Sequence, residues 1–302
     1  MLSDDCVLKD RVPLIVRGLE IGNCVQKWNH LEYLQAALEE KKVSVHICPV
    51  PQMDFLSKNF QYITMDAASL LQKCTENFSS MSSDDAVKSK VYYYLRSLST
   101  ENQRKIPADF YADFPSLAQD FVMPKELLER QIFSSILRLS SPSCQMWTHY
   151  DITDNLLVQV VGRKSITLFA PHEVPNLYLT GDKSRVLNIA EPDLKKFPLF
   201  SNVLHHVGTL EPGDGVYIPA LWFHNTTALQ LSVAVNIFWR ALDPTFYDSK
   251  DVYGNKDLLP AQRVQQSMEK SLSILQSLPN PYRTVYGLRM IERIKDTLLN
   301  SS

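Results

Sequence analysis

Short stretches in which hydrophobic and polar residues alternate recur along the chain, and this period of two predicts β-strands. Most of them are rich in β-branched and aromatic residues, which favour extended structure. The predicted strands cover residues 12–18, 43–50, 91–98, 132–140, 156–162, 164–169 and 215–219. The strands 156–162 and 164–169 are separated only by Arg163 and are expected to form a hairpin. The runs 156–162 and 215–219 each adjoin a segment that contains histidine, so the candidate chemistry is expected at their ends.

Two stretches in the first third of the chain follow a helical period instead. In residues 28–40 the apolar positions are Trp28, Leu31, Leu34 and Leu38, and in the next stretch they are Ala67, Leu70, Leu71 and Cys74. The pair Met65-Asp66 is expected to cap the second helix. The polar residues 75–85 after it are expected to form a solvated loop.

After Asp243-Pro244 the pattern becomes helical. Residues 260–278 and 282–299 each carry one apolar stripe, and Pro279-Asn280-Pro281 interrupts them. The stripes consist of Val264, Met268, Leu272 and Leu275 in the first helix, and Val285, Leu288, Ile291, Ile294 and Leu298 in the second. From the pattern alone, the two helices are expected to cover the rest of the fold.

The composition is that of a folded protein without a strong charge. Of the 302 residues, 45% are hydrophobic, which is ample for a core. The formal net charge is −2 and the isoelectric point is about 6.4, so any contact with RNA must come from a local basic face. The basic residues are dispersed along the sequence, and by default they form a solvated surface.

Five scattered cysteines indicate a reducing compartment. Cys6, Cys24, Cys48, Cys74 and Cys144 are odd in number and form no Cys-x-x-Cys, which argues against both a disulfide framework and a zinc ribbon. The acidic N-terminus lacks the features of a signal peptide, and no apolar run reaches membrane-spanning length. We therefore expect an intracellular protein, cytoplasmic or nuclear, without a membrane partner.

The most specific local pattern is a His-x-Asp pair at His149 and Asp151. Residues two apart in a strand project from the same face, so both side chains can converge on one ion. A third candidate ligand, His224, follows the apolar strand 215–219. Two histidines and one carboxylate form the facial triad of non-haem Fe(II), which leaves coordination positions open.

Two alternatives to this iron site remain at the level of the residues. Zinc is the rival metal, but zinc sites usually recruit cysteine or a third histidine at close spacing, and neither is present near His149. His205 or His206 could replace His224. This pair ranks lower, because adjacent strand residues point to opposite faces and at most one of them could face a metal.

An arginine stands among apolar neighbours in the predicted strand 132–140. A buried and unpaired guanidinium is costly, so Arg138 is expected to face a partner, a wet cavity or the exterior. The sequence leaves open whether Arg138 binds a substrate or forms an ion pair with a carboxylate of its own chain.

These residues form part of a larger set of motifs that resembles the JmjC branch of the cupin-fold Fe(II)/2-oxoglutarate dioxygenases. The resemblance extends from about residue 12 to the C-terminus. Its motifs are His149-x-Asp151, Asn155, Lys164, the segment 213–219, Trp222-x-His224 and the segment 236–239. Within the branch, the segments 52–55, 92–98, 133–142, 147–151 and 187–189 look most like the tRNA hydroxylases of wybutosine synthesis.

The resemblance implies a fold that is mainly β with α. Its core would be a double-stranded β-helix, the cupin or jelly-roll fold, with N-terminal α/β elements and a C-terminal helical pair. Residues 1–243 would form the catalytic domain, and residues 244–302 a helical region for dimerisation. The implied assembly is a homodimer that forms through these helices.

The resemblance also implies a set of site residues. Fe(II) would be held by His149, Asp151 and His224, with 2-oxoglutarate as cosubstrate. Lys164 matches the lysine that binds the far carboxylate of the cosubstrate, and Tyr94, Asn155 and Asn236 match positions that donate to it. Relatives often place a cosubstrate-binding threonine three residues before the first histidine, whereas this chain has Met146 there.

The implied reaction is the hydroxylation of a carbon atom, with succinate and CO2 as coproducts. The implied substrate is the wybutosine precursor, a tricyclic base with an aminocarboxypropyl chain beside the anticodon of tRNA(Phe). Arg138 would bind the carboxylate of this side chain, and Trp147 or Trp222 would stack against the rings of the base. The alternatives are a protein side-chain hydroxylase or lysyl demethylase, and a catalytically silent binding module.

Overall fold

The chain divides into two compact units. The computed structural model describes residues 10–79, 90–99 and 105–299. The first unit comprises residues 1–242 and 250–255, and the second comprises residues 243–249 and 256–302. Cys6 and residues 80–85 of the predicted loop lie outside the described residues.

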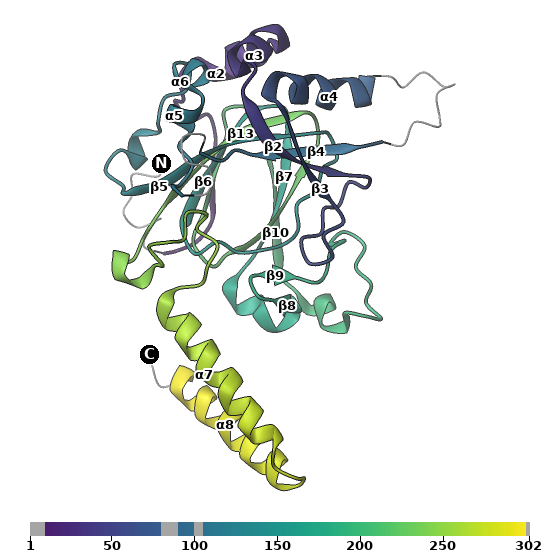
Figure 1. Ribbon diagram of the computed structural model, residues 1–302, viewed down its shortest axis with the longest axis vertical. Coiled ribbons are helices and arrows are strands. Elements are labelled where there is room, and N and C mark those ends of the chain that lie inside the picture. The colour runs from purple at the N-terminus through teal and green to yellow at the C-terminus, as the bar shows by residue number, and fades with distance from the viewer. Residues whose placement is uncertain (1–9, 80–89, 100–104, 300–302) are drawn as a thin grey trace. The chain divides into compact units, whose positions relative to one another are not determined.

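The core of the first unit consists of two antiparallel sheets that curve toward each other (Figure 1). The large sheet has eight strands, in the order β1 (Leu14–Val16), β11 (Gly215–Ile218), β6 (Asp154–Val161), β13 (Ser232–Trp239), β5 (Ile132–Ser140), β4 (Tyr92–Arg96), β2 (Lys42–Cys48) and β3 (Gln61–Asp66). The small sheet has the order β10 (His205–Leu210), β7 (Lys164–Phe169) and β12 (Phe223–Ala228). Short strands β8 (Leu179–Thr180) and β9 (Lys183–Ser184) form a separate pair. The expected fold class, mainly β with a jelly-roll core, is confirmed.

Helices cover the outer face of the large sheet (Figure 1). They are α2 (Cys24–Trp28), α3 (Leu31–Leu38), α4 (Ala67–Ser79), α5 (Phe110–Asp113) and α6 (Pro115–Ala118). In β6, Leu156 and Val158 pack against the helical layer, whereas Leu157 packs against the small sheet. Successive residues in this part of β6 therefore alternate between the helical layer and the interior between the sheets.

The second unit contains the helices α7 (Leu259–Gln276) and α8 (Tyr282–Leu299). Both agree with the prediction from their apolar stripes to within two residues at each end. The described residues of these helices include many large apolar side chains that stay exposed within the unit, among them Val264, Met268, Leu272, Ile274, Val285, Leu288, Ile291, Ile294 and Leu298. No helix in the described part of the chain is both long and apolar enough to cross a membrane.

The prediction of one helix over residues 28–40 is wrong in detail. The structure has two helices, because Trp28 ends α2 and His30 is extended, with φ −85° and ψ 104°, before α3 begins at Leu31. Trp28, Leu34 and Leu38 are buried as the pattern indicated, but Leu31 is 43% exposed. A common apolar stripe therefore did not imply a continuous helix.

The region around α4 also differs from the prediction. Met65 and Asp66 end strand β3, which the pattern did not predict, and the helix starts directly at Ala67. Asp66 forms an ion pair with Lys42 on the neighbouring strand at 2.7 Å. Residues 75–79 of the expected loop are helical and extend α4 to Ser79.

Strands β6 and β7 do not form the hairpin that the short turn between them suggested. β6 pairs with β11 and β13 in the large sheet, and β7 pairs with β10 and β12 in the small sheet. The chain crosses between the sheets at Gly162, which has φ +70°. A Cβ there would lie 1.9 Å from the carbonyl oxygen of Leu231, so only glycine fits.

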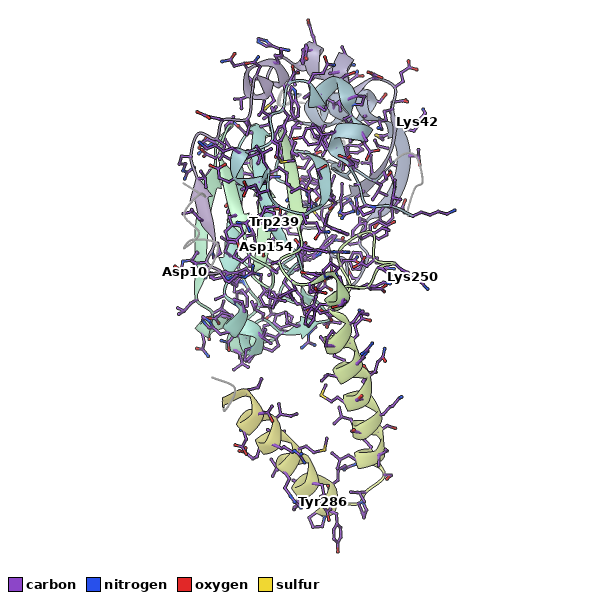
Figure 2. All side chains as sticks on the ribbon, turned by 90° about the vertical axis from the view of Figure 1, so that its left-hand side faces the viewer. Asp10, Lys42, Asp154, Trp239, Lys250 and Tyr286 are labelled. Carbon is purple, nitrogen blue, oxygen red and sulfur yellow. The ribbon has the colours of Figure 1, made fainter. Side chains whose placement is uncertain are left out.

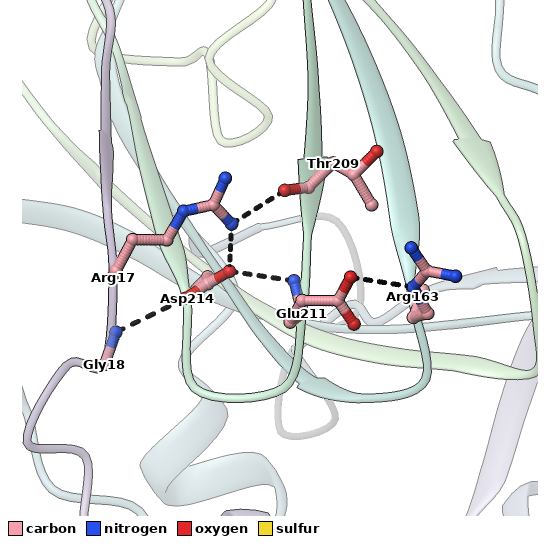
Figure 3. A network of polar contacts seen from close by, with 6 residues as sticks. All are labelled: Arg17, Gly18, Arg163, Thr209, Glu211 and Asp214. Atoms are coloured by element: carbon pink, nitrogen blue, oxygen red, sulfur yellow. Dashed lines mark hydrogen bonds and ion pairs between the residues drawn. The ribbon is translucent and has the colours of Figure 1, made fainter.

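The turn between β10 and β11 is tied to the first strand by a polar network (Figure 3). The carboxylate of Asp214 accepts hydrogen bonds from the Arg17 guanidinium, from the backbone N–H of Gly18 at 3.3 Å and from that of Glu211 at 2.9 Å. Glu211 in turn pairs with Arg163 at 2.8 Å. The motif at residues 213–219 therefore begins with a fixed turn, which sets the register of β11.

A second carboxylate, Asp154, organises the opposite end of β6. In the register of the large sheet it lies opposite Trp239 of β13 (Figure 2). Its side chain pairs with Arg11 at 2.7 Å and accepts a hydrogen bond from the backbone N–H of Ala220 at 2.9 Å. Asp154 thereby holds the short connection between β11 and β12, the strand that carries His224.

Candidate functional site

Strand alternation brings most of the predicted site residues to the interior between the two sheets. Leu95, Leu137 and Leu139 pack against the helical layer, so their neighbours in the strands, Tyr94 and Arg138, face the interior. In the other strands, too, residues two apart project from the same face. The interior positions include Tyr94, Arg138, Asn155, Lys164, His224 and Asn236.

The two histidines are brought together by the backbone. Residues around His149 run antiparallel to β12, so His149 and His224 lie directly opposite each other and exchange two hydrogen bonds. The N–H of His224 donates to the carbonyl of His149 at 2.8 Å, and the reverse bond measures 3.2 Å. Their ring centroids are 4.4 Å apart. This register gives the two rings a common point of convergence.

Asp151 completes the group. Its carboxylate lies 3.6 Å from Nε2 of His224, and the candidate ligand atoms of His149, Asp151 and His224 all lie within 4.8 Å of one another. The backbone carbonyl of Asp151 accepts a hydrogen bond from the N–H of Leu221 at 2.8 Å, which fixes it beside the connection to β12. His149 and Asp151 are half-buried, and His224 is buried.

Both imidazoles are oriented for coordination through the same nitrogen. Nδ1 of His149 lies 3.0 Å from the carbonyl of Trp147, and Nδ1 of His224 lies 3.2 Å from that of Trp222. A carbonyl can only accept, so Nδ1 carries the proton and Nε2 stays free as a ligand. The set of two imidazoles and one carboxylate fits a divalent transition metal with open positions.

Burial keeps these histidines neutral. Desolvation lowers the pKa of His149, and desolvation together with the neighbouring His149 lowers the pKa of His224 to about 4. Nearby Asp151 opposes both shifts. A neutral imidazole is the form that binds metal, so the site is prepared for an ion at neutral pH.

Lys164 is buried on the interior face at the start of β7, with 4% of its surface exposed. Burial lowers the pKa of its ammonium to about 7, and Arg138 lowers it further by repulsion. Among the described residues, the ammonium has neither a hydrogen-bond acceptor nor an ion-pair partner. A buried cation without a partner is costly, so this position is suited to an anionic ligand.

Arg138, Tyr94 and the two asparagines form one hydrogen-bonded chain beside Lys164. The Arg138 guanidinium donates from Nη1 to the hydroxyl of Tyr94 and from Nε to Asn236 Oδ1, the latter at 2.8 Å. Asn236 Nδ2 then donates to Asn155 Oδ1 at 2.9 Å. These hydrogen bonds fix the position of each polar group, and the hydroxyl proton of Tyr94 stays available for a hydrogen bond to a ligand.

A comparison with known families agrees with this arrangement. A family model described as a cupin-like domain matches residues 2–244. The chain belongs to the cupin-like domain family. It is 46% identical to the tRNA wybutosine-synthesizing protein 5 of Mus musculus over 286 residues, which cover 95% of this chain and 89% of that protein.

Two further relatives of this cupin-like chain are informative. The tRNA wybutosine-synthesizing protein 5 of Homo sapiens is 45% identical over 286 residues, 95% of this chain and 89% of the relative. The tRNA wybutosine-synthesizing protein 4 of Gibberella zeae is 38% identical over 300 residues, but these make up only 27% of that longer protein. The similarity thus spans both units of the cupin-like chain.

The two tryptophans expected to contact the substrate, Trp147 and Trp222, have different surroundings. Trp147 belongs to an aromatic cluster beside His149: its ring stacks on Phe60 at 5.9 Å and lies 5.2 Å from Phe55 and 6.0 Å from His149. Trp222 instead packs between the sheets, and its indole N–H donates to the carbonyl of Arg11 at 2.9 Å. Of these two tryptophans, Trp147 is therefore the one whose ring contacts that of a candidate ligand, His149.

Two features of the site were missed in the sequence. Arg96 is one of the dispersed basic residues that were expected to be solvated, but it lies half-buried in β4 on the same face as Tyr94. The signal was present, because residues two apart in a strand share a face. Lys183 of β9 pairs with His149 in an isolated bridge and lies 4.5 Å above the Phe55 ring. No local pattern indicated that contact, because β9 has only two residues.

Proposed function

We propose that this chain is an Fe(II)- and 2-oxoglutarate-dependent hydroxylase of wybutosine biosynthesis that acts on tRNA. The observation that carries the proposal is the combination of two groups on one interior face. One is the cluster of His149, Asp151 and His224, and the other is the buried ammonium of Lys164, which has no partner among the described residues. The names of the relatives supply the pathway and the class of substrate.

The donor set supports iron rather than a structural metal. His149, Asp151 and His224 offer two nitrogen ligands and one oxygen ligand, which leave positions open on an octahedral ion. The described cysteines, Cys24, Cys48, Cys74 and Cys144, are all buried and none belongs to the ligand cluster. A closed zinc site of the usual sulfur-rich type does not fit these residues.

The interior polar residues would hold the cosubstrate. The Lys164 ammonium would pair with the far carboxylate of 2-oxoglutarate, which compensates the cost of burying both charges. The hydroxyl of Tyr94 would donate a hydrogen bond to the same carboxylate, while Asn155 and Asn236 keep the neighbouring positions polar. Met146, where relatives often place a threonine, contributes only apolar contact in its cluster.

The proposed reaction converts a C–H bond of the substrate, O2 and 2-oxoglutarate into C–OH, succinate and CO2. Bound iron would supply activation of O2, with the electrons drawn from oxidation of the cosubstrate. The chain itself would orient the ligands and keep the histidines neutral. Arg138 and Trp147 would position the wybutosine precursor of tRNA(Phe) beside the metal.

We also propose that the chain forms a homodimer through α7 and α8. The large apolar side chains exposed on both helices support this assembly, since monomers rarely expose a continuous apolar stripe. The net charge of the chain is −2, so the chain as a whole does not attract RNA. The tRNA would therefore bind to a local basic face.

The deciding experiment couples cosubstrate turnover to a mass change on tRNA. The purified chain would first be tested anaerobically for binding of Fe(II) and 2-oxoglutarate. Succinate release in air would then be measured with tRNA that carries the wybutosine precursor, with the same tRNA lacking it and with peptide pools. We expect succinate release and a gain of one oxygen only with precursor-bearing tRNA.

The other outcomes separate the alternatives. Succinate coupled to a peptide would indicate a protein hydroxylase or lysyl demethylase and would refute the tRNA substrate. Absence of both iron and 2-oxoglutarate binding would leave a catalytically silent binding module.

A further inference from the structure

Two arginines lie directly opposite each other on neighbouring strands. In the register of β4 and β5, Arg96 is the partner of Arg138, and both side chains project to the interior face that carries Tyr94. Side chains in such a pair start only about 5 Å apart. Like charges in this position destabilise a sheet.

Neither guanidinium forms an ion pair within the described part of the chain, since no described carboxylate lies within 4.0 Å of Arg96 or Arg138. Asp151 attracts Arg96 from a greater distance, but its carboxylate belongs to the metal-ligand cluster. Burial and repulsion by Arg138 lower the pKa of Arg96 to about 10, which reflects an environment unfavourable to the charge.

Each arginine is nevertheless held in place by neutral groups. Nη2 of Arg96 donates to the carbonyl of Tyr253 at 3.1 Å, and the guanidinium lies 5.6 Å from the centre of the Tyr253 ring. Arg138 is held by the Tyr94 hydroxyl and by Asn236. A guanidinium has five N–H donors, so both side chains keep donors for a further acceptor.

We propose that Arg96 and Arg138 form a two-arginine clamp for an anionic group of the substrate. This inference rests on the proposed function, in which Lys164 pairs with the far carboxylate of the cosubstrate. Two opposed guanidiniums match the geometry of a carboxylate or a phosphate, which accepts two parallel hydrogen bonds. Arg96 is thus a positioning residue for substrate, and the bound anion removes the repulsion between the two strands.

The anion has two sources in a modified tRNA. One is a carboxylate on the side chain of the modified base, and the other is a phosphate of the backbone. A carboxylate is present only in precursor-bearing tRNA, whereas phosphates are present in every tRNA. Binding to the two forms therefore distinguishes the sources.

The test begins with the stability of the free protein. We would compare Arg96→Gln with Arg185→Gln, because Arg185 donates to the carbonyl of Tyr178 at 3.2 Å and lies 5.8 Å from the centre of its ring. Arg185 has the same kind of contacts on the exposed surface, without an opposing arginine. If Arg96 acts in the clamp, Arg96→Gln has an unchanged or higher Tm, whereas Arg185→Gln has a slightly lower one.

The second measurement is the affinity for tRNA. For precursor-bearing tRNA, Arg96→Gln is expected to raise Kd and KM about tenfold or more, as the loss of a charge-assisted hydrogen bond would. Arg96→Lys should recover part of the loss, since it keeps the charge but not the fork. A loss confined to precursor-bearing tRNA identifies the carboxylate, and an equal loss for both tRNAs identifies a phosphate.

The clamp is refuted if Arg96→Gln lowers Tm more than Arg185→Gln does and leaves both affinities unchanged. That result would make Arg96 a structural residue. The proposed hydroxylase would be unaffected, because its failure appears in the wild-type chain as absent iron binding or absent succinate release.

Discussion

The buried ammonium of Lys164 makes the stability of the free protein depend on pH. Burial sets its pKa at about 7 in the folded chain, against about 10.4 in an unfolded one. The unfolded chain therefore binds more protons between these values, so stability rises with pH across that window. The cost of burying the charge is fully present below about pH 7 and vanishes above about pH 10.4.

Replacing Lys164 by methionine should therefore stabilise the protein when no cosubstrate is bound. We expect Lys164→Met to unfold at a higher temperature than wild type at about pH 6.5, with a gain on the order of a few kcal/mol at most that shrinks toward pH 9.5. The exposed Lys195→Met serves as the control. Lower stability of Lys164→Met at pH 6.5 would mean that Lys164 has a stabilising partner in the free protein.

The choice between His224 and the pair at 205–206 is a second question at the scale of single residues. His224 lies opposite His149, whereas His205 and His206 lie exposed on β10, the edge strand of the small sheet. We expect His224→Ala to abolish Fe(II) binding in equilibrium dialysis and His206→Ala to retain it. Retained binding in His224→Ala would exclude the proposed ligand set.

At the scale of elements, the crossing from β6 to β7 depends on Gly162. An alanine there would have a left-handed backbone and would also collide with the carbonyl oxygen of Leu231. We expect Gly162→Ala to lower the free energy of unfolding by more than about 2 kcal/mol, measured by chemical denaturation.

Gly181 offers a matched control for this substitution. It has φ +59°, but apart from its chain neighbours no described atom lies within 4 Å of the position that a Cβ would take. Gly181→Ala therefore has only the backbone cost of about 1 kcal/mol. Equal losses for the two variants would show that the strands can shift to accept a side chain, and that the crossing is not fixed by Gly162.

At the scale of the whole molecule, the exposed apolar stripes of α7 and α8 predict an assembly. The apolar residues of α8 include Ile291, which is 49% exposed. We expect the full chain to behave as a dimer in size-exclusion chromatography with light scattering, and Ile291→Asp to behave as a monomer because a charge would be buried in the interface.

Ser273→Asp is the control for this experiment, because it places the same charge on an exposed polar position of α7. It should remain dimeric. A monomeric wild-type chain, or a dimeric Ile291→Asp variant, would contradict dimerisation through these helices.

The sequence by itself determined the features that depend on neighbouring residues. The alternation of apolar residues predicted β5 and β7 to the residue, and it predicted which side chains of a strand share a face. The His-x-Asp pair named two of the candidate ligands for the same reason. These inferences hold because a strand fixes the relative direction of side chains without reference to the rest of the fold.

Only the tertiary structure decided which segments lie side by side. The turn at Gly162 suggested a hairpin, yet β6 and β7 belong to different sheets, and Lys164 is buried as a consequence. The opposition of Arg96 and Arg138 follows from the register of two strands that are distant in sequence. Such pairings are set by the packing of the whole molecule, which a local pattern does not encode. They place the cations Arg96, Arg138 and Lys164 around the interior between the two sheets.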